Sequence, residues 1–597
     1  MARVTLGAGR AGGGARGAGR RRGGAGDRWA GWAALFALAL AVRLLFWRAT
    51  ADAAWPGAAG YQGDAWMWLD YARALAAGRP FELGVPIRPP GMAWLLAAVW
   101  DGSRPGLAVA GFCQALLGAL AVVLFALAAR RACGTRVGIL TGLVCAGSSG
   151  LLMLSTSLNN ETPYLVVVGC ILLLTEAARR ADRLLPVAAW GGLNALACLI
   201  RVEHALFFFL ALAWLAWGWR AGSGRRRVAR AAAVAGLAFA AVLAPWQLTI
   251  WGRLHDFNTG PPATGAASER AFAAQEAALA SLDWEPGALA ARDALPAFLR
   301  RPAANFVAAT VAHRQRRVVR AEDFGLLAEA FGYCPRPLAA RPFVVSTGGL
   351  NFALANHSRS HGGFDPAPLA APPPLAGGRG AWPAALVAGL PPRDLAFTYP
   401  GHLRLVNEGY AVGWRWIRSH PGAALRLAGR KLAIFWRGAT LGWTGWNAPL
   451  AGGGLRRAVD LATPEGRWPA AWRALMLAVV AWGLVLAWQR APARVWLLFL
   501  ASKLAVTVLF YGYARQGATT IPVVALALAL AGERLLARWR PGGRRLTLAA
   551  LAAGGLLLAA EAARYAAAPE LVVDGRPVRA RDVPPPGDHE EHTIAWR

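Results

Sequence analysis

The chain has 597 residues, of which 56% are hydrophobic, and it carries a formal net charge of +32. A mean hydropathy of +0.36 is too high for a soluble globular protein of this length, so the composition excludes that class. In a soluble chain such a charge would suggest a nucleic acid partner. Here much of it lies in short basic runs between apolar stretches, which indicates membrane topology signals and no nucleic acid partner.

The first 28 residues are rich in glycine and arginine, as in GARGAGRRRGGAG. Such tails can bind RNA, but a disordered cytoplasmic tail that orients the first membrane helix is the preferred interpretation for residues 1–28.

Apolar stretches recur along the chain at lengths of about 20 residues, enough for a helix to cross the hydrocarbon core. They predict an all-α polytopic membrane protein with about eleven transmembrane helices and a large mixed periplasmic loop or cap. The predicted helices lie near 30–47, 105–129, 136–154, 162–178, 184–200, 205–219, 231–250, 471–488, 493–510, 517–536 and 545–562.

Basic clusters support this count because eleven spans place all of them on one side, which the positive-inside rule makes the cytoplasm. The clusters are Arg20–Arg22, Arg130/Arg131/Arg136, Arg179/Arg180/Arg183, Arg220 with Arg225–Arg230, Arg490/Arg494 and Arg538–Arg545. Segment 424–447 is apolar enough to suggest a further span, but that span would place Arg490 and Arg494 outside. It is therefore predicted to be an interfacial helix.

The predicted domain organisation follows from this topology. An N-terminal transmembrane module occupies 29–250 and contains the first outer loop, 48–104. A periplasmic loop or cap occupies 251–470, a C-terminal transmembrane module occupies 471–562, and residues 563–597 form an outer tail. The predicted location is a bacterial inner membrane, with the functional surface on the periplasmic side.

Asp64 stands in the first outer loop, separated by one residue from the amphipathic sequence WMWLDYARALAAG that follows it. A carboxylate there can cap the free N–H groups of a helix, and it can also accept a proton from a reacting group. Glu161 stands at a predicted outer helix start, where the helix dipole favours a negative charge. Both roles remain open for both residues.

Several segments together resemble the GT-C membrane glycosyltransferases. They are YARALAAGRPF and RPPGMAWLLA in the first outer loop, APWQLTIWGR at 244–253, STGGLNFALANHSRSHGGF at 346–364 and HPGAALRLAGRKLAIFW at 420–436. The resemblance covers most of residues 30–540 and is greatest to the branch of protein O-mannosyltransferases, the aminoarabinose transferase of lipid A and the RgtA/B/C/D-like enzymes. It implies inverting transfer of a hexosyl or pentosyl group from a polyprenyl-phosphate-linked sugar to a glycan, lipid or protein acceptor outside the membrane.

In this family an acidic residue of the first outer loop is the base or orients the acceptor, and Asp64 matches that position. Where the family has a neighbouring acid or amide, this chain has Ala65, so Glu161 or Glu203 is the expected partner carboxylate. The resemblance also implies that Arg88 and Arg515 bind the donor phosphate.

Arginine suits that task because its planar fork binds phosphate oxygens in pairs and stays protonated. Arg201 is a third candidate on the outer side. For all three arginines, anchoring to lipid headgroup phosphates is the alternative.

Two further sites are predicted with less definition. Glu203 and His204 could bind a divalent metal together with Asp64; the family resemblance leaves this open, since some relatives need a divalent cation and others do not. Gly348, Gly349, Asn351 and Asn356 are predicted to form a substrate loop, because glycine allows a ligand to approach the backbone closely. A plain turn between packed elements is equally consistent with that sequence.

The alternative function is a lipid-linked oligosaccharide transporter or polymerase. Transporters place polar residues within mid-membrane helices, whereas charged residues are nearly absent from the span centres here, apart from Arg43 near one end and Lys503. The preferred hypothesis is therefore glycosyl transfer.

Overall fold

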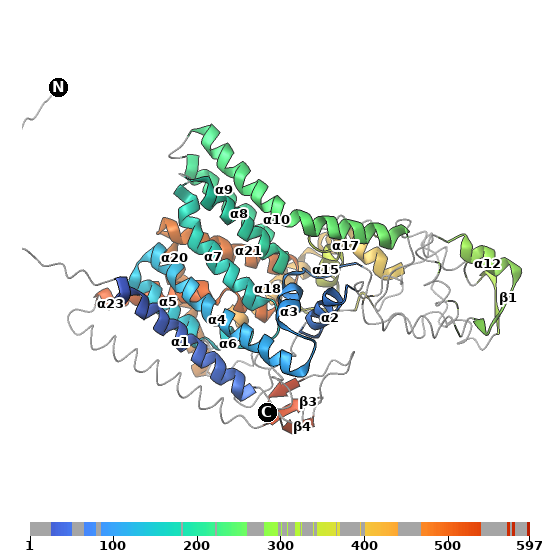
Figure 1. Cartoon of the computed structure of the whole chain (residues 1–597), viewed down its shortest axis with the longest axis horizontal. Helices are drawn as coiled ribbons and strands as arrows, with labels where there is room; N and C mark the ends of the chain where they lie inside the picture. Colours follow the sequence, from blue (N-terminus) through green and yellow to red (C-terminus); the bar gives the residue numbers. More distant parts are fainter. Residues whose placement is uncertain are drawn as a thin grey trace, which may run out of the picture.

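The structure, a computed structural model, is mainly helical (Figure 1). It describes residues 25–50, 65–78, 85–180, 183–220, 224–259, 277, 280–295, 300, 307, 317–322, 324, 338, 343–365, 367–369, 395, 400–439, 467–538, 570–573, 576–579 and 594–596. Asp64, the 545–562 span and most of 260–342 lie outside the described residues. The predicted all-α membrane class is confirmed, and short strands occur only at the edges of the described part.

A bundle of long apolar helices forms the body of the molecule. The N-terminal helices are α1 (Ala25–Thr50), α4 (Arg104–Cys133), α5 (Thr135–Gly147), α6 (Ser149–Thr156), α7 (Glu161–Arg180), α8 (Leu184–Ile200), α9 (His204–Arg220) and α10 (Arg225–Thr259). The C-terminal helices are α20 (Arg467–Trp488), α21 (Arg494–Leu509), α22 (Ala514–Ala518) and α23 (Ile521–Arg538).

Among the described residues, four helices are long and apolar enough to cross a membrane, or five if the bent pair α5–α6 is one span. Three shorter apolar helices lie at 29–45, 184–200 and 475–488. These helices confirm a multi-pass membrane protein. The count of eleven spans stays a prediction.

Two predicted spans are broken in the structure. The stretch 136–154 was expected as one helix, but α5 and α6 meet at an angle of 61° at Ser148. The stretch 517–536 was also expected as one helix, and its start belongs to the short α22, which ends before α23 begins. Both breaks lie among Ser, Thr and Gly residues, which are weak helix formers.

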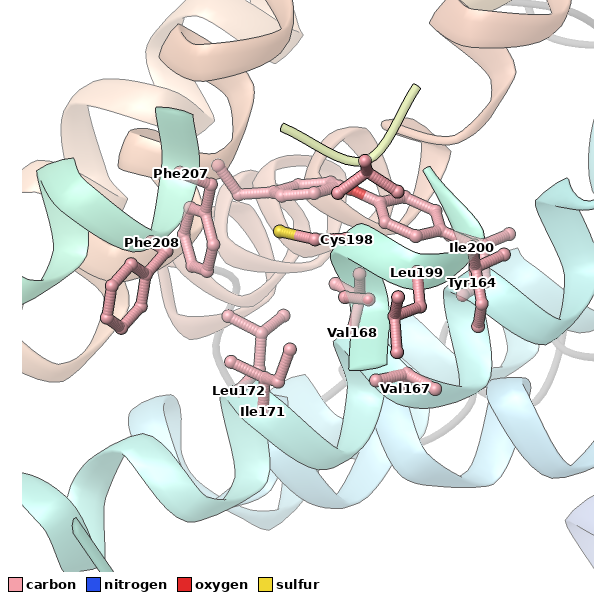
Figure 2. Close-up of a cluster of buried hydrophobic side chains, with 14 of the residues drawn as sticks. Tyr164, Val167, Val168, Ile171, Leu172, Cys198, Leu199, Ile200, Phe207 and Phe208 are labelled. Atoms are coloured by element: carbon pink, nitrogen blue, oxygen red, sulfur yellow. The ribbon is translucent and has the colours of Figure 1, made fainter. Parts of the chain in front are cut away.

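The core of the bundle is built from large side chains on α7, α8 and α9 (Figure 2). Ile171 of α7 and Phe207 of α9 are fully buried, and Phe208 stacks on Phe239 of α10 with ring centroids 4.0 Å apart. Close helix contacts depend on small residues, since a Cβ on Gly191 would lie 2.3 Å from the Ala235 carbonyl oxygen. The resulting packing fixes the helix ends that carry the polar residues described below.

Shorter elements gather beyond one end of the bundle. They are α2 (Ala65–Ala76), α3 (Gly91–Val99), α12 (Pro286–Asp293), α15 (Gly348–Ala355), α17 (Pro400–Ser419) and α18 (Pro421–Ala439). Helix α10 extends from the bundle to this region (Figure 1). Helix α18 begins three residues before the interfacial helix predicted at 424–447, and residues 440–447 lie outside the described part.

Two small sheets complete the described part. Strand β1 (Asp283–Trp284) pairs in parallel with β2 (Val318–Val319) beside α12. Near the C-terminus, β3 (Glu570–Val573) pairs antiparallel with both β4 (Arg576–Arg579) and β5 (Ile594–Trp596).

Candidate active site

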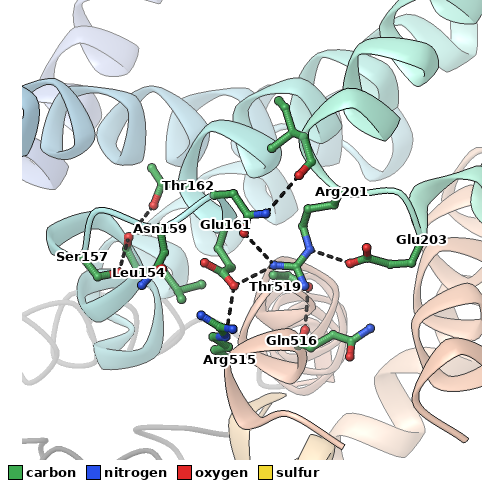
Figure 3. Close-up of polar contacts among 12 residues, drawn as sticks. Leu154, Ser157, Asn159, Glu161, Thr162, Arg201, Glu203, Arg515, Gln516 and Thr519 are labelled. Carbon is green, nitrogen blue, oxygen red and sulfur yellow. Dashed lines mark hydrogen bonds and ion pairs between the residues drawn. The ribbon is translucent and has the colours of Figure 1, made fainter. Parts of the chain in front are cut away.

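A polar network lies where α7 and α9 begin and α22 approaches them (Figure 3). Glu161, the first residue of α7, has a side chain that is only 1% exposed. Its Oε1 atom accepts a hydrogen bond from Arg201 Nη1 at 2.7 Å and lies 3.6 Å from Arg515 Nε. Its Oε2 atom is buried, and no hydrogen-bond partner reaches it from the described residues.

Arg201 lies in the turn between α8 and α9 and is surrounded by oxygen atoms. Its Nε donates to Glu203 Oε1 at 2.5 Å, and its Nη1 also donates to Asn160 Oδ1 at 3.1 Å. Two carboxylates thus offset its charge. This geometry favours a role in holding Glu161 over the predicted contact with a donor phosphate.

Glu203 connects this network to α21. Its Oε1 lies 3.2 Å from Lys503 Nζ, and the Lys503 side chain is only 1% exposed. Burial alone would raise the pKa of Glu203, but Arg201 and Lys503 together lower it below its usual value. Lys503 was recognised in the sequence only as a charge inside an apolar stretch. A lone ionisable residue in such a stretch is itself a signal of a buried functional group.

His204 is fully buried and both of its ring nitrogens have partners. Nδ1 lies 2.9 Å from the Tyr164 hydroxyl, and Nε2 lies 3.0 Å from Asn194 Oδ1. With Glu203 turned toward two cations, this arrangement favours a structural role over the predicted metal site. No group of three or more His, Cys, Asp or Glu within the described ranges could hold a metal ion.

Arg88 lies in the segment 85–90, which two separate parts of the chain hold in place. The Tyr71 hydroxyl of α2 accepts hydrogen bonds from the backbone N–H groups of Ile87 and Arg88 at 2.7 and 3.3 Å. From the segment before α15, the Ser346 and Thr347 hydroxyls donate to the carbonyls of Pro86 and Ile87. The backbone at Arg88 is therefore fixed on both sides.

Two tyrosines between α21 and α22 lie close to Arg515. The rings of Tyr511 and Tyr513 lie 5.3 Å apart, and the Arg515 guanidinium lies 5.6 Å from the Tyr513 ring. Burial raises the pKa of Tyr511 well above its usual value, Tyr513 raises it further, and the charge of Arg88 lowers it. Arg515 therefore lies beside the Tyr513 ring, and the charge of Arg88 acts on the neighbouring Tyr511.

The predicted substrate loop is instead a helix for most of its length. Gly348 and Gly349 begin α15, and a Cβ on Gly349 would lie 2.9 Å from the Val406 carbonyl oxygen of α17. The mutual approach is closer still at Gly409, where a Cβ would lie 2.1 Å from the Gly349 carbonyl oxygen. The prediction of a loop was wrong, because glycines that suggested a flexible turn serve to pack two helices.

Asn351 and Asn356 differ in position within this segment. Asn351 lies in α15 and is partly buried, whereas Asn356 follows α15 and is 4% exposed. The Asn356 side chain donates to the Leu509 carbonyl at 2.8 Å and accepts from Lys431 Nζ at 2.9 Å. Asn356 therefore joins α15, α18 and α21, a structural task that the sequence did not indicate.

Asp64 lies outside the described residues, directly before α2. The helix predicted to follow it is present, with Trp68 almost completely buried against Tyr71. The Arg88 guanidinium lies 6.0 Å from the Trp68 ring. Ala65, the residue after Asp64, therefore begins α2, the helix that lies beside Arg88.

Part of the helix bundle and the segment before it match a known protein family. Residues 87–246 match the family described as dolichyl-phosphate-mannose-protein mannosyltransferase. This segment contains Arg88, Glu161, Arg201, Glu203 and His204. No curated protein matches the chain significantly.

Similarity to solved structures is weak. The archaeal oligosaccharyltransferase AglB from Archaeoglobus fulgidus, solved with an inhibitory peptide and a dolichol-phosphate, aligns at 13% identity and a TM-score of 0.43. That alignment covers 91% of this chain and 56% of AglB, so the chain spans just over half of AglB's length. ArnT from Cupriavidus metallidurans, bound to undecaprenyl phosphate, aligns at 15% identity and a TM-score of 0.30, covering 85% of this chain and 79% of ArnT. TM-scores below 0.5 do not establish a common fold. The family match shows that residues 87–246 are similar to the dolichyl-phosphate-mannose-protein mannosyltransferases, a family of membrane glycosyltransferases.

Proposed function

We propose that this chain is an inverting glycosyltransferase that moves a hexosyl or pentosyl group from a polyprenyl-phosphate-linked donor to an acceptor. The acceptor is a glycan, a lipid or a protein. The reaction takes place at the outer, periplasmic face of a bacterial inner membrane. The family match supports the lipid-linked donor, and the sequence topology supports the outer face.

One observation carries the proposal: Arg515 lies beside both the Glu161 carboxylate and the Tyr513 ring at the end of an apolar helix bundle, and the charge of Arg88 acts on the neighbouring Tyr511. The network beside them contains two carboxylates, Glu161 and Glu203, and three cations, Arg201, Arg515 and Lys503. These five side chains leave one positive charge in excess, and Arg88 adds a second. Such an excess suits a phosphate group that must be held and then released with a full charge.

The proposed reaction needs a base and a cationic site for the leaving group. The acceptor oxygen or nitrogen forms a bond to the anomeric carbon while the bond from that carbon to the phosphate oxygen breaks. The acceptor proton passes to the Asp64 carboxylate, and the carrier leaves as polyprenyl phosphate. Arg88 and Arg515 stabilise the negative charge that develops on the phosphate.

Glu161 is proposed to position Arg515. Its Oε1 atom already contacts Arg201 and Arg515, so the carboxylate holds one arginine that is only 11% exposed and another that is 25% exposed. Of the two, Arg515 is the one that a ligand can reach. The site involves no metal-dependent step in this proposal.

The alternative, a lipid-linked oligosaccharide transporter or polymerase, would place charged groups along a path through the helices. Lys503, the charge inside α21, contacts Glu203 in the turn between α8 and α9. It therefore belongs to the same end of the bundle as Glu161, which favours a site at one membrane face.

The direct test uses membranes that contain the full chain and matched membranes that lack it. Both are incubated with a panel of polyprenyl-phosphate sugars, and released polyprenyl phosphate is measured by mass spectrometry. The proposal expects release from at least one donor only in the membranes with the chain. Equal release in both membranes for every donor would contradict it.

A further inference from the structure

A second polar cluster lies on the segment Asn356–Asp365, which follows α15 and packs against the residues between α21 and α22. The Gly512 N–H donates to the Gly362 carbonyl at 2.8 Å. The Phe364 ring lies edge-on to Tyr511, with centroids 5.8 Å apart. With the Asn356 bond to Leu509, these contacts fix the segment at both ends.

His357 and Asp365 face each other across this segment. His357 Nε2 lies 3.8 Å from Asp365 Oδ2, beyond direct hydrogen-bond distance. His357 Nδ1 accepts a hydrogen bond from the Arg359 N–H, so the neutral ring carries its proton on Nε2. Burial lowers the pKa of His357 more than the charge of Asp365 raises it, so the pKa lies below its usual value. The ring is therefore neutral near pH 7, and its Nε2–H group is a hydrogen-bond donor.

The Nε2 atom of His357 and the hydroxyl of Tyr511 both lack a hydrogen-bond partner among the described residues, and both atoms are buried. A buried polar atom without a partner costs about 1–3 kcal/mol, so such atoms in a native structure require an explanation. His357 lies beside Asp365, and Phe364, the neighbour of Asp365 in the chain, contacts the Tyr511 ring, so a ring N–H, a carboxylate and a hydroxyl lie where these two segments meet. The charges of Asp365 and Arg88 also act on Tyr511.

The charges decide which ligand fits. A phosphate group beside Asp365 would meet a like charge, whereas a hydroxyl group can accept from His357 and donate to Asp365. An oxygen about 2.7 Å from each atom bridges the 3.8 Å gap at roughly a right angle. Phe364, whose ring lies edge-on to Tyr511, is 46% exposed, so the cluster borders the surface of the molecule at this residue.

We propose that His357, Asp365 and Tyr511 form a subsite that binds hydroxyl groups of the donor sugar, next to the phosphate position at Arg88. This proposal rests on the proposed glycosyl transfer and adds the residues that recognise the sugar. Buried polar groups of this kind reject analogues that lack the matching hydroxyl, because the groups are then left unpaired. The three residues are positioning residues for the sugar and take no part in proton transfer.

The test measures binding and does not require turnover. The full chain in lipid nanodiscs is titrated with undecaprenyl phosphate, and separately with undecaprenyl phosphate linked to mannose, glucose, galactose or aminoarabinose. The variants are Asp365→Asn and Tyr511→Phe, which keep the side-chain shape, and the matched control is Glu322→Gln on an exposed carboxylate. Thermal midpoints establish that each variant is folded.

The wild-type chain is expected to bind one sugar-linked carrier more tightly than bare undecaprenyl phosphate. Asp365→Asn is expected to weaken that binding about tenfold or more, the effect of a lost hydrogen bond to a charged group. Tyr511→Phe should weaken it by a smaller factor. Binding of bare undecaprenyl phosphate should change less than about twofold in both variants, and Glu322→Gln should match the wild type.

The outcomes separate the two proposals. If both variants keep the wild-type preference for the sugar-linked carrier, the subsite is contradicted while glycosyl transfer stands. Weakened binding of bare and sugar-linked carrier by the same factor would also overturn the subsite, because these residues would then bind the phosphate or hold the fold. If the wild-type chain binds no carrier at all, both proposals fall together.

Discussion

Arg201 Nη1 lies 2.7 Å from Glu161 Oε1, and this contact joins the turn between α8 and α9 to the first residue of α7. The same guanidinium contacts Glu203, so one arginine bridges two carboxylates inside the bundle. Arg515 reaches Glu161 from the other side at 3.6 Å. The positions of the cations at this end of the bundle therefore depend on the two carboxylates between them.

The first prediction concerns this bridge. Arg201→Ala leaves Glu161 and Glu203 without their shared partner in a buried place, which costs about 3–5 kcal/mol when a buried ion pair loses one member. We expect a clear fall in the thermal midpoint of the purified protein. Arg201→Lys should be milder, because it retains the charge but cannot bond both carboxylates with the same geometry. A midpoint unchanged by Arg201→Ala would show that the bridge does not stabilise the fold.

The second prediction concerns the donor phosphate. Arg88→Lys and Arg515→Lys retain a positive charge but lose bidentate binding, so the donor KM should rise while the fold persists. Alanine at either position should have a larger effect than lysine. Arg292→Lys, on the exposed helix α12, is the matched control. If Arg88→Ala leaves both KM and turnover unchanged, Arg88 serves only to anchor the chain to lipid headgroups.

The third prediction is a pH dependence with a defined sign. The folded pKa of Glu203 lies below its unfolded value of 4.5, because Arg201 and Lys503 outweigh the effect of burial. A lowered carboxyl pKa adds stability that is fully present above the unfolded value and is lost as pH falls through the folded value. The thermal midpoint of the wild type, relative to that of Glu203→Gln, should therefore decrease as the pH falls below about 4.5. A constant difference between the two proteins at all pH values would exclude this contribution.

Several parts of this arrangement could be predicted from the sequence. Glu161 was expected at a helix start and Arg201 to His204 at a helix junction, and the structure confirms both positions. These predictions held because long apolar periodic stretches define their own ends. A helix was likewise predicted at 424–447, where α18 covers Pro421–Ala439, and its position at the membrane interface stays a prediction.

Other parts could not be predicted, for identifiable physical reasons. The helix that begins at Gly348 depends on its contact with α17, and a single sequence does not contain that information. The contact between Lys503 and Glu203 joins residues 300 positions apart. The apolar and polar pattern predicts each stretch of the sequence separately. It could therefore show that Lys503 lies in an apolar helix, but not that Glu203 is its partner.

The fourth prediction tests the side of the membrane. In a variant without native cysteines, Ser419→Cys should react with an impermeant thiol reagent added from the outside of spheroplasts. Gly224→Cys, between α9 and α10, should react only after the membrane is opened. Both residues are exposed in the structure, so a lack of reaction reports the membrane side. The opposite pattern would place the Glu161 network at the cytoplasmic face and contradict the outer site.

The fifth prediction, and the most direct test of the account, is the transfer rate of Asp64→Asn. Asparagine keeps the size of the side chain and caps helices as well as aspartate does, but it cannot accept the acceptor's proton. With the donor found in the membrane assay, release of polyprenyl phosphate should fall by roughly two to four orders of magnitude. Protein yield and thermal midpoint should stay near those of the wild type. Near-normal release by Asp64→Asn would contradict the assignment of Asp64 as the base.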